Sequence, residues 1–256
     1  GISGKIHAKA RHKPIEEPRF KHNQDSGIFI DCTRATQNIS WYGEIKLHDQ
    51  IIKIDSFKGT RDRSWGLRPI GNKDNKETKH TEAPQFYWIW TPMNFPNHCI
   101  FYHRNDDSLG KSWNCRAVVD NLEENSRLEI TSPKIEIDYR KNTRRINGLK
   151  IKLEEAELEF IPGRVFYMQG LGYTHPDWGH GNNHGKLEVG FDIIDLDKAE
   201  SELAKGLIHN LHIQTLSKIK FKTPEIFITG QGVIEQLFIG RHKPSGFEGI
   251  LDRIIE

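Results

Sequence analysis

The stretch ISWYGEIKL (39–47) decides the fold class, because apolar and polar residues alternate along it. Alternation with a period of two places successive side chains on opposite faces of a β-strand. The same pattern recurs in short runs that are rich in β-branched and aromatic residues and are separated by turn residues. These runs are 26–32, 51–57, 85–90, 98–103, 112–119, 127–139, 146–153, 156–160, 164–168, 186–196, 218–221, 225–230 and 233–240. They predict a mostly β protein whose antiparallel sheets close into a barrel or a sandwich.

Helical composition is confined to residues 197–211, where Gly206 weakens the pattern. A polar stretch, NLEENS (121–126), separates two groups of predicted strands and marks the predicted domain boundary. We therefore expect an N-terminal β-domain over residues 1–120 and a C-terminal β-domain over residues 121–256.

Composition excludes several classes of function. Lysine and arginine number 37 against 35 acidic residues, a net charge of +2, so we expect no specific nucleic-acid binding. No apolar run approaches the ~20 residues of a membrane-spanning helix. Three scattered cysteines do not make a disulfide framework and indicate a reducing compartment, so the predicted location is cytoplasmic. No P-loop or glycine-rich loop leading into a helix is present, and no cofactor is predicted.

The segment GTRDRSWGLRP (59–69) is dense in charged and aromatic residues. Alternation along a strand puts Arg61, Arg63 and Trp65 on one face and Asp62 on the other. One interpretation is a structural arginine–aspartate ion pair that closes the end of a barrel, with Trp65 packed over it. The other is a carboxyl group, Asp62, held in a partly apolar cleft, where it serves as an acid or a base.

A second dense segment is GLGYTHPDWGHGNNHG (170–185), whose five glycines and one proline predict a loop. A polar and aromatic loop between strands is a favourable place for a functional site. Its histidine spacing resembles that of a metal site, but Gly-Asn-Asn prevents the helix that would align His180 with His184. We therefore predict no tightly bound transition metal at His175, His180 and His184.

The third segment is the aromatic strand FYWIW (86–90), in which Trp88 and Trp90 share a face with Phe86 in line. Core packing explains such a face in most proteins. The alternative is an apolar wall for a bound ligand.

Three segments, 59–69, 170–190 and GQGVIEQLFIGRHKPSGF (230–247), resemble a group of bacterial proteins. That group is distantly similar to the hydroxyneurosporene synthase (carotenoid 1,2-hydratase) superfamily, whose relatives include lipocalin-fold Diels–Alderases. The resemblance covers residues 20–250 approximately. It implies two lipocalin-like (calycin) antiparallel β-barrels side by side, with a ligand cleft in or between them. Members of the superfamily usually carry more chain before the RDRSW strand, so the first barrel is expected to be incomplete.

The resemblance also implies an enzyme of the hydratase, lyase or cyclase type, which acts on a terpenoid-, steroid- or polyketide-like small molecule. Protonation of an alkene needs an acid, aromatic faces for the developing cation and a dry pocket. The predicted catalytic residues are Asp62, Asp177 and His180. The predicted substrate-binding residues are Arg61, Arg63, Trp65, Trp88, Trp90, Tyr173, His175 and Trp178. Two alternatives remain open, a non-catalytic lipocalin-like carrier and a carbohydrate-binding β-domain.

Overall fold

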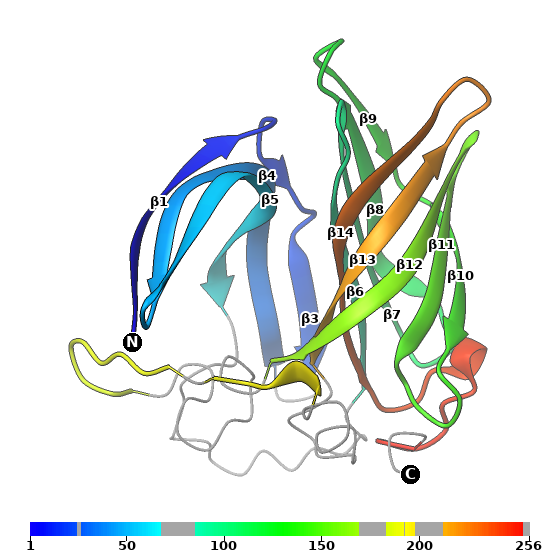
Figure 1. The fold of residues 1–256 in the computed structure, drawn as a ribbon. Coiled ribbons are helices and arrows are strands. Elements are labelled where there is room, and N and C mark those ends of the chain that lie inside the picture. The colour runs from blue at the N-terminus through cyan, green and yellow to red at the C-terminus, as the bar shows by residue number, and fades with distance from the viewer. Residues whose placement is uncertain (25–26, 68–84, 169–182, 192, 198–211, 253–256) are drawn as a thin grey trace.

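A computed structural model describes the chain except for residues 25–26, 68–84, 169–182, 192, 198–211 and 253–256. The described residues form two antiparallel β-sheets, one of five strands and one of nine. Figure 1 shows the five-stranded sheet in blue and cyan beside the nine-stranded sheet, which curls into a half-barrel. The prediction of a mostly β, antiparallel protein is confirmed.

The five-stranded sheet is organised around one long strand, β4 (Gly27–Leu47). Strand β4 pairs with every other member of this sheet. These partners are β1 (Ile2–Ala10), β2 (Ile15–Glu16), β3 (Phe20–Gln24) and β5 (Gln50–Leu67). The stretch 39–47 lies within β4, where it pairs with β1 on one side and with β5 on the other.

The nine-stranded sheet has the order β10-β11-β12-β13-β14-β6-β7-β8-β9, so it is a meander whose two halves join where β14 pairs with β6. One half consists of β6 (Phe86–Asn94), β7 (His98–Asp106), β8 (Ser112–Asn121) and β9 (Ser126–Ile130). The other half consists of β10 (Lys134–Tyr139), β11 (Ile146–Leu153), β12 (Ala156–Tyr167), β13 (Ile213–Lys222) and β14 (Phe227–Ile239). A short 3-10 helix, η2 (Lys243–Ser245), follows β14.

Alternation along β6 divides its side chains between two apolar clusters. Tyr87, Ile89 and Met93 join the large core on one face of the nine-stranded sheet. Trp88 and Trp90 join a smaller cluster on the other face. This second cluster includes Ile15 of β2, so it packs between the two sheets. Because fully buried side chains such as Tyr102 and Leu149 fill the large core, the concave side of the half-barrel is packed rather than open.

Polar contacts also join the two sheets. The Asn38 side-chain amide on β4 donates to the Met93 carbonyl oxygen at 2.7 Å. Arg11 donates to Asn94 Oδ1 at 2.8 Å, and Arg127 donates to the Lys13 carbonyl oxygen at 2.7 Å. Buried polar groups that are satisfied across an interface fix the geometry of that interface.

Two glycines of β14 allow close approach to β6. A Cβ atom at Gly230 would lie 2.4 Å from the Asn94 carbonyl oxygen, and one at Gly232 would lie 2.5 Å from the Pro92 carbonyl oxygen. The glycines of the GQGVIEQ segment therefore serve strand packing at the junction of the two halves of the sheet.

The prediction of a strand over 186–196 is wrong for those residues of the segment that the structure describes. Residues 183–191 and 193–195 have no strand, and Leu187 and Val189 are 84% and 80% exposed. Alternation specifies a strand only where a neighbouring strand accepts its backbone hydrogen bonds. Within the described chain this segment has no such partner.

Two further predictions concern the organisation of the chain. The helix predicted over 197–211 lies outside the described residues, apart from residue 197. The chain passes from the five-stranded to the nine-stranded sheet between β5 and β6, whereas residue 120 lies in β8, within the larger sheet. The division into domains at residues 120 and 121 stays a prediction.

Candidate functional site

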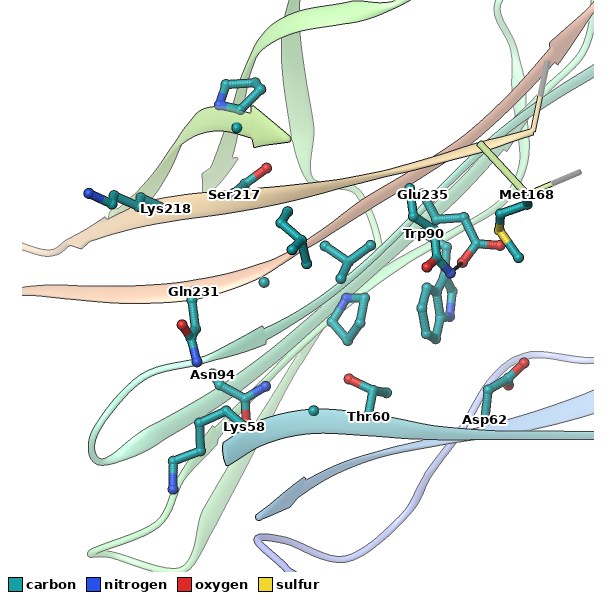
Figure 2. Close-up of a pocket in the computed structure, with 18 of the residues that line it drawn as sticks. Lys58, Thr60, Asp62, Trp90, Asn94, Met168, Ser217, Lys218, Gln231 and Glu235 are labelled. Atoms are coloured by element: carbon teal, nitrogen blue, oxygen red, sulfur yellow. Dashed lines mark hydrogen bonds between the residues drawn. The ribbon is translucent and has the colours of Figure 1, made fainter. Parts of the chain in front are cut away.

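A cavity of about 900 Å³ lies between the two sheets. One wall is β5, with Arg34 of β4 beside it, and the other is formed by β6, β12, β13 and β14. Its apolar lining consists of Trp88, Trp90, Pro92, Ile161, Pro162, Met168, Leu216 and Val233. Its polar lining consists of Arg34, Lys58, Thr60, Asp62, Asn94, Gln214, Ser217, Lys218, Gln231 and Glu235. Figure 2 shows Lys58, Thr60 and Asp62 of β5 on one side of the cavity, with labelled residues of the other wall, such as Lys218 and Glu235, on the facing side.

The wall of the nine-stranded sheet is built from rows of paired residues. Lys218 pairs with Gln231, and Gln231 pairs with Asn94, so these three form one row. Two residues further along, Leu216 pairs with Val233. The next row holds Gln214, Glu235 and Trp90. Directly paired residues point to the same face of a sheet, so the register delivers all three rows to the cavity.

The opposite wall is built by alternation along β5. Lys58, Thr60 and Asp62 occupy every second position of β5 and therefore share one face of the strand. Their partners on β4 are Ser40, Asn38 and Thr36, which are all buried. Asp62 therefore points towards the nine-stranded sheet, as Figure 2 shows, although its side chain stays exposed at the edge of the cavity.

Glu235 is the centre of a buried hydrogen-bond group at one end of the cavity. Its Oε1 lies 2.7 Å from His212 Nε2, and its Oε2 accepts a hydrogen bond of 2.6 Å from the Gln214 side chain. The side chains of His212 and Glu235 are 8% and 9% exposed. An imidazole and a carboxylate at this distance can share a proton, which is the arrangement used in general acid–base chemistry.

Arg34 places a positive charge beside this group. Its Nε donates to Glu17 Oε2 at 3.0 Å, and its guanidinium lies 5.1 Å from the centre of the Trp88 ring. Burial lowers the pKa of Arg34, but the carboxylates of Glu17, Asp62 and Glu235 outweigh that effect and the net pKa is raised. Arg34 is thus a permanent cation that three carboxylates surround.

Glu17 holds this end of the two sheets together. Its Oε1 accepts hydrogen bonds from Thr36 Oγ1 at 3.0 Å and from Trp90 Nε1 at 3.3 Å. Because Trp90 belongs to the nine-stranded sheet and Arg34 to the five-stranded one, Glu17 fixes both side chains that flank the carboxylate end of the cavity.

The other end of the cavity carries lysines. Lys58 Nζ donates to Ser40 Oγ at 2.9 Å and to Ser56 Oγ at 3.0 Å, while Lys218 is exposed on the facing strand. In the part of the chain that the structure describes, neither lysine forms an ion pair. The cavity is therefore acidic at one end and basic at the other.

The structure places the sequence-predicted site residues in three groups. Asp62, Trp88 and Trp90 line the cavity. Arg61, Arg63 and Trp65 point to the opposite face of the five-stranded sheet and are exposed, so they do not line it. Tyr173, His175, Asp177, Trp178 and His180 lie outside the described residues.

A protein family described as a family of unknown function (DUF8625) matches residues 1–248 of the chain. The chain belongs to this family. The match includes both sheets and every residue that lines the cavity. No curated protein matches the chain. The chemistry of the cavity therefore carries the functional argument for this DUF8625 member.

Two solved structures resemble the DUF8625 chain at low identity. Kievitone hydratase from Nectria haematococca is 14% identical with a TM-score of 0.44, over 86% of this chain and 64% of that one. A candidate AttH protein from Nitrosomonas europaea is 10% identical with a TM-score of 0.46, over 85% of this chain and 55% of that one. The DUF8625 chain thus spans less than two thirds of the length of either structure.

The described residues contain no group of three or more histidine, cysteine, aspartate or glutamate side chains placed to hold a metal ion. The metal prediction concerns His175, His180 and His184, of which the first two lie outside the described residues, so it stays a prediction. None of the helical segments described is long and apolar enough to cross a membrane.

The sequence analysis missed Arg34, Glu235, His212 and Glu17. One signal was available, since Glu235 interrupts the apolar run of β14 with a charge on the face shared with Val233. Arg34 gave a similar signal, because it is a charged residue in a part of β4 where the polar residues nearest to it in sequence, Thr33 and Thr36, are neutral. Glu17 and His212 gave no local signal, because their partners are distant in sequence. Glu17 meets Trp90 only through the packing of the two sheets, and His212 meets Glu235 only through the pairing of β13 with β14.

Proposed function

We propose that this protein binds an apolar small molecule in the cavity between its two sheets and transforms it by proton transfer, in a hydration, an isomerisation or a cyclisation. One observation carries the proposal. The cavity places Glu235 and Asp62 on facing walls, next to Arg34 and the rings of Trp88 and Trp90.

The cavity has the properties of a small-molecule site. Its volume of about 900 Å³ falls within the ~300–1,000 Å³ of typical ligand sites. Its middle is lined by Pro92, Leu216 and Val233, and Leu216 is 62% exposed. A bound apolar molecule would remove this surface from water, which stabilises the complex by about 25 cal/mol for each Å² buried.

The two carboxylates suit opposite roles in a proton-transfer reaction. Glu235, which lies 2.7 Å from His212 Nε2, acts as the acid and donates a proton to a carbon of the substrate. Asp62 on the facing wall orients a water and takes one of its protons as the water oxygen bonds to the neighbouring carbon. The net addition is one water across a double bond. Asp62 then loses its proton to solvent at the edge of the cavity, and Glu235 is reprotonated.

The same residues serve an isomerisation or a cyclisation. Glu235 delivers a proton to one carbon, and Asp62 removes a proton from another, so the substrate keeps its composition. In each case the faces of Trp88 and Trp90 stabilise the positive charge that develops on carbon. Arg34 pairs with Glu17 and lies against the Trp88 ring, and Glu17 in turn holds Trp90, so these contacts keep both rings in position.

The two alternatives predict different features. A carrier needs the cavity but no paired acid and base, whereas Glu235 and His212 meet at 2.7 Å beside the apolar lining. A carbohydrate-binding domain stacks sugars on open tryptophan faces. Trp88 and Trp90 are each 6% exposed and are enclosed between the sheets.

The direct test is to extract the purified protein with organic solvent and to identify the bound molecules by mass spectrometry. We expect a bound apolar molecule in the wild type and its loss in Val233→Trp, which fills the middle of the cavity. Leu128→Trp is the matched control, because Leu128 is 51% exposed on β9 and does not line the cavity. Equal recovery of the molecule from Val233→Trp would contradict binding in this cavity.

The same extraction separates an enzyme from a carrier. Glu235→Gln is expected to hold the substrate, while the wild type holds the product. The two molecules should differ in mass by one water for a hydration, or differ only in chromatographic retention for an isomerisation or cyclisation. Identical molecules in both proteins would support a carrier and overturn the catalytic part of the proposal.

A further inference from the structure

The charges that line the cavity show which class of molecule fits it. We infer that the ligand is an elongated apolar carboxylate, whose head group binds Lys58 and Lys218 and whose reacting carbons lie beside Glu235. This inference rests on the proposed function and adds the ligand's charge and its direction in the cavity.

Both walls of the cavity carry the same gradient of charge. On β5 the sequence runs from Lys58 through Thr60 to Asp62. On the facing wall Lys218 lies four residues from the row of Glu235, along the same direction in Figure 2. Four residues of a strand span about 13 Å, so the cation end and the carboxylate end are separated by that distance. The two facing walls therefore have their lysines at the same end of the cavity and their carboxylates at the other end.

The lysine end is suited to an anion. Lys58 Nζ is held by two neutral hydroxyl groups, those of Ser40 and Ser56, which fix its position without neutralising it. The amide side chains of Asn94 and Gln231 lie in the same row as Lys218. Ammonium groups and amides converging on one end of a cavity are the donors that bind a carboxylate.

A further positive charge stands behind this end. Arg11 Nη1 donates to Asn94 Oδ1 at 2.8 Å, and Arg11 Nη2 donates to the Phe95 carbonyl oxygen at 2.7 Å. The polarisation of Asn94 by Arg11 strengthens the amide as a hydrogen-bond donor.

The carboxylate end gives the ligand its direction. The cation at this end, Arg34, is already paired with Glu17, whereas Asp62 and Glu235 repel an anionic head group. The head group is therefore expected at Lys58 and Lys218. Between the two ends, Leu216, Val233 and Pro92 offer apolar contact only. A neutral hydrocarbon would gain nothing from the lysines and would not be oriented by them.

The test compares cis-parinaric acid with its methyl ester, two fluorescent probes that share one hydrocarbon chain and differ in the charge of the head group. The wild type should bind the acid about tenfold more tightly than the ester, as a charge-assisted hydrogen bond implies. Lys58→Met and Lys218→Met should each weaken binding of the acid severalfold and leave binding of the ester within about twofold.

The matched control is Lys220→Met. Lys220 lies on β13 two residues from Lys218 and is paired with Glu159 at 3.0 Å, away from the cavity. It should leave binding of both probes unchanged. Because Lys218 is exposed, Lys218→Met carries little risk to folding and keeps the test decisive if Lys58→Met is unstable.

The outcomes separate this inference from the proposed function. Equal affinities for acid and ester that both fall in Val233→Trp would overturn the inference and leave the cavity as a neutral-ligand site. Binding of neither probe would overturn the inference, and if extraction also recovers no molecule from the wild type, the proposed function falls with it. Preference for the acid that survives both lysine substitutions would place the head group elsewhere and contradict the inference.

Discussion

Replacing Arg34 with methionine removes the cation that the carboxylates of Glu17, Glu235 and Asp62 surround. Methionine keeps the apolar stem of the side chain against Trp88 but leaves Glu17, which is 3% exposed, without its ion-pair partner. Thr36 and Trp90 still donate hydrogen bonds to Glu17. They do not compensate a full negative charge in a site from which water is excluded.

The expected loss is about 3–5 kcal/mol in the free energy of unfolding, the usual result of removing one partner of a buried ion pair. The assay is urea unfolding at pH 7, followed by circular dichroism and by tryptophan fluorescence, whose agreement tests for a two-state transition. Arg34→Met combined with Glu17→Gln removes both charges, so the double variant should be less destabilised than the sum of the two single variants.

A loss below about 1 kcal/mol in Arg34→Met would refute the reasoning, because it is the value of an exposed ion pair. Strict additivity of the two substitutions would refute it as well, since it would mean that Arg34 and Glu17 do not interact. Either result would mean that Arg34 does not stabilise the carboxylates at this end of the cavity.

Three further predictions follow from individual contacts. Burial lowers the pKa of His103 to about 4, so the folded protein excludes a proton that the unfolded chain binds below its ordinary pKa of ~6.5. Stability should therefore fall by about 2 kcal/mol between pH 7 and pH 5 in the wild type and by less in His103→Gln, as urea unfolding at both pH values would show. Gly232→Ala should lower the melting temperature, because its Cβ would lie 2.5 Å from the Pro92 carbonyl oxygen; at about 1–3 kcal/mol the cost of such overpacking is measurable, and an unchanged melting temperature would contradict the close approach. Once a substrate is known, Glu235→Gln should lower kcat by about 10²–10⁴-fold with KM nearly unchanged, and a change confined to KM would make Glu235 a binding residue only.

The strands and their faces could be predicted from the sequence because β-structure leaves a local trace. Alternation along β5 separates Asp62 from Arg61 and Arg63, and the structure has this separation. Alternation along β6 puts Trp88 and Trp90 on one face, and both line the cavity. The same rule failed at residues 186–196, because alternation does not show whether another strand lies alongside.

The chemistry of the cavity could not be predicted in the same way. Glu235 meets His212 through pairing of β13 with β14, and Glu17 meets Trp90 only when two sheets pack together. These contacts depend on tertiary register, which a single sequence does not encode in any local pattern. The sequence analysis favoured segments with dense motifs, whereas the paired carboxylate and imidazole come from isolated residues in otherwise ordinary strands.

The most direct test of the account is a crystal structure of the protein grown with cis-parinaric acid. We expect electron density between the two sheets, with the carboxylate at Lys58 and Lys218 and the hydrocarbon chain running past Leu216 and Val233 to Glu235. Density within the concave side of the nine-stranded half-barrel, with the cavity between the sheets holding only water, would contradict it.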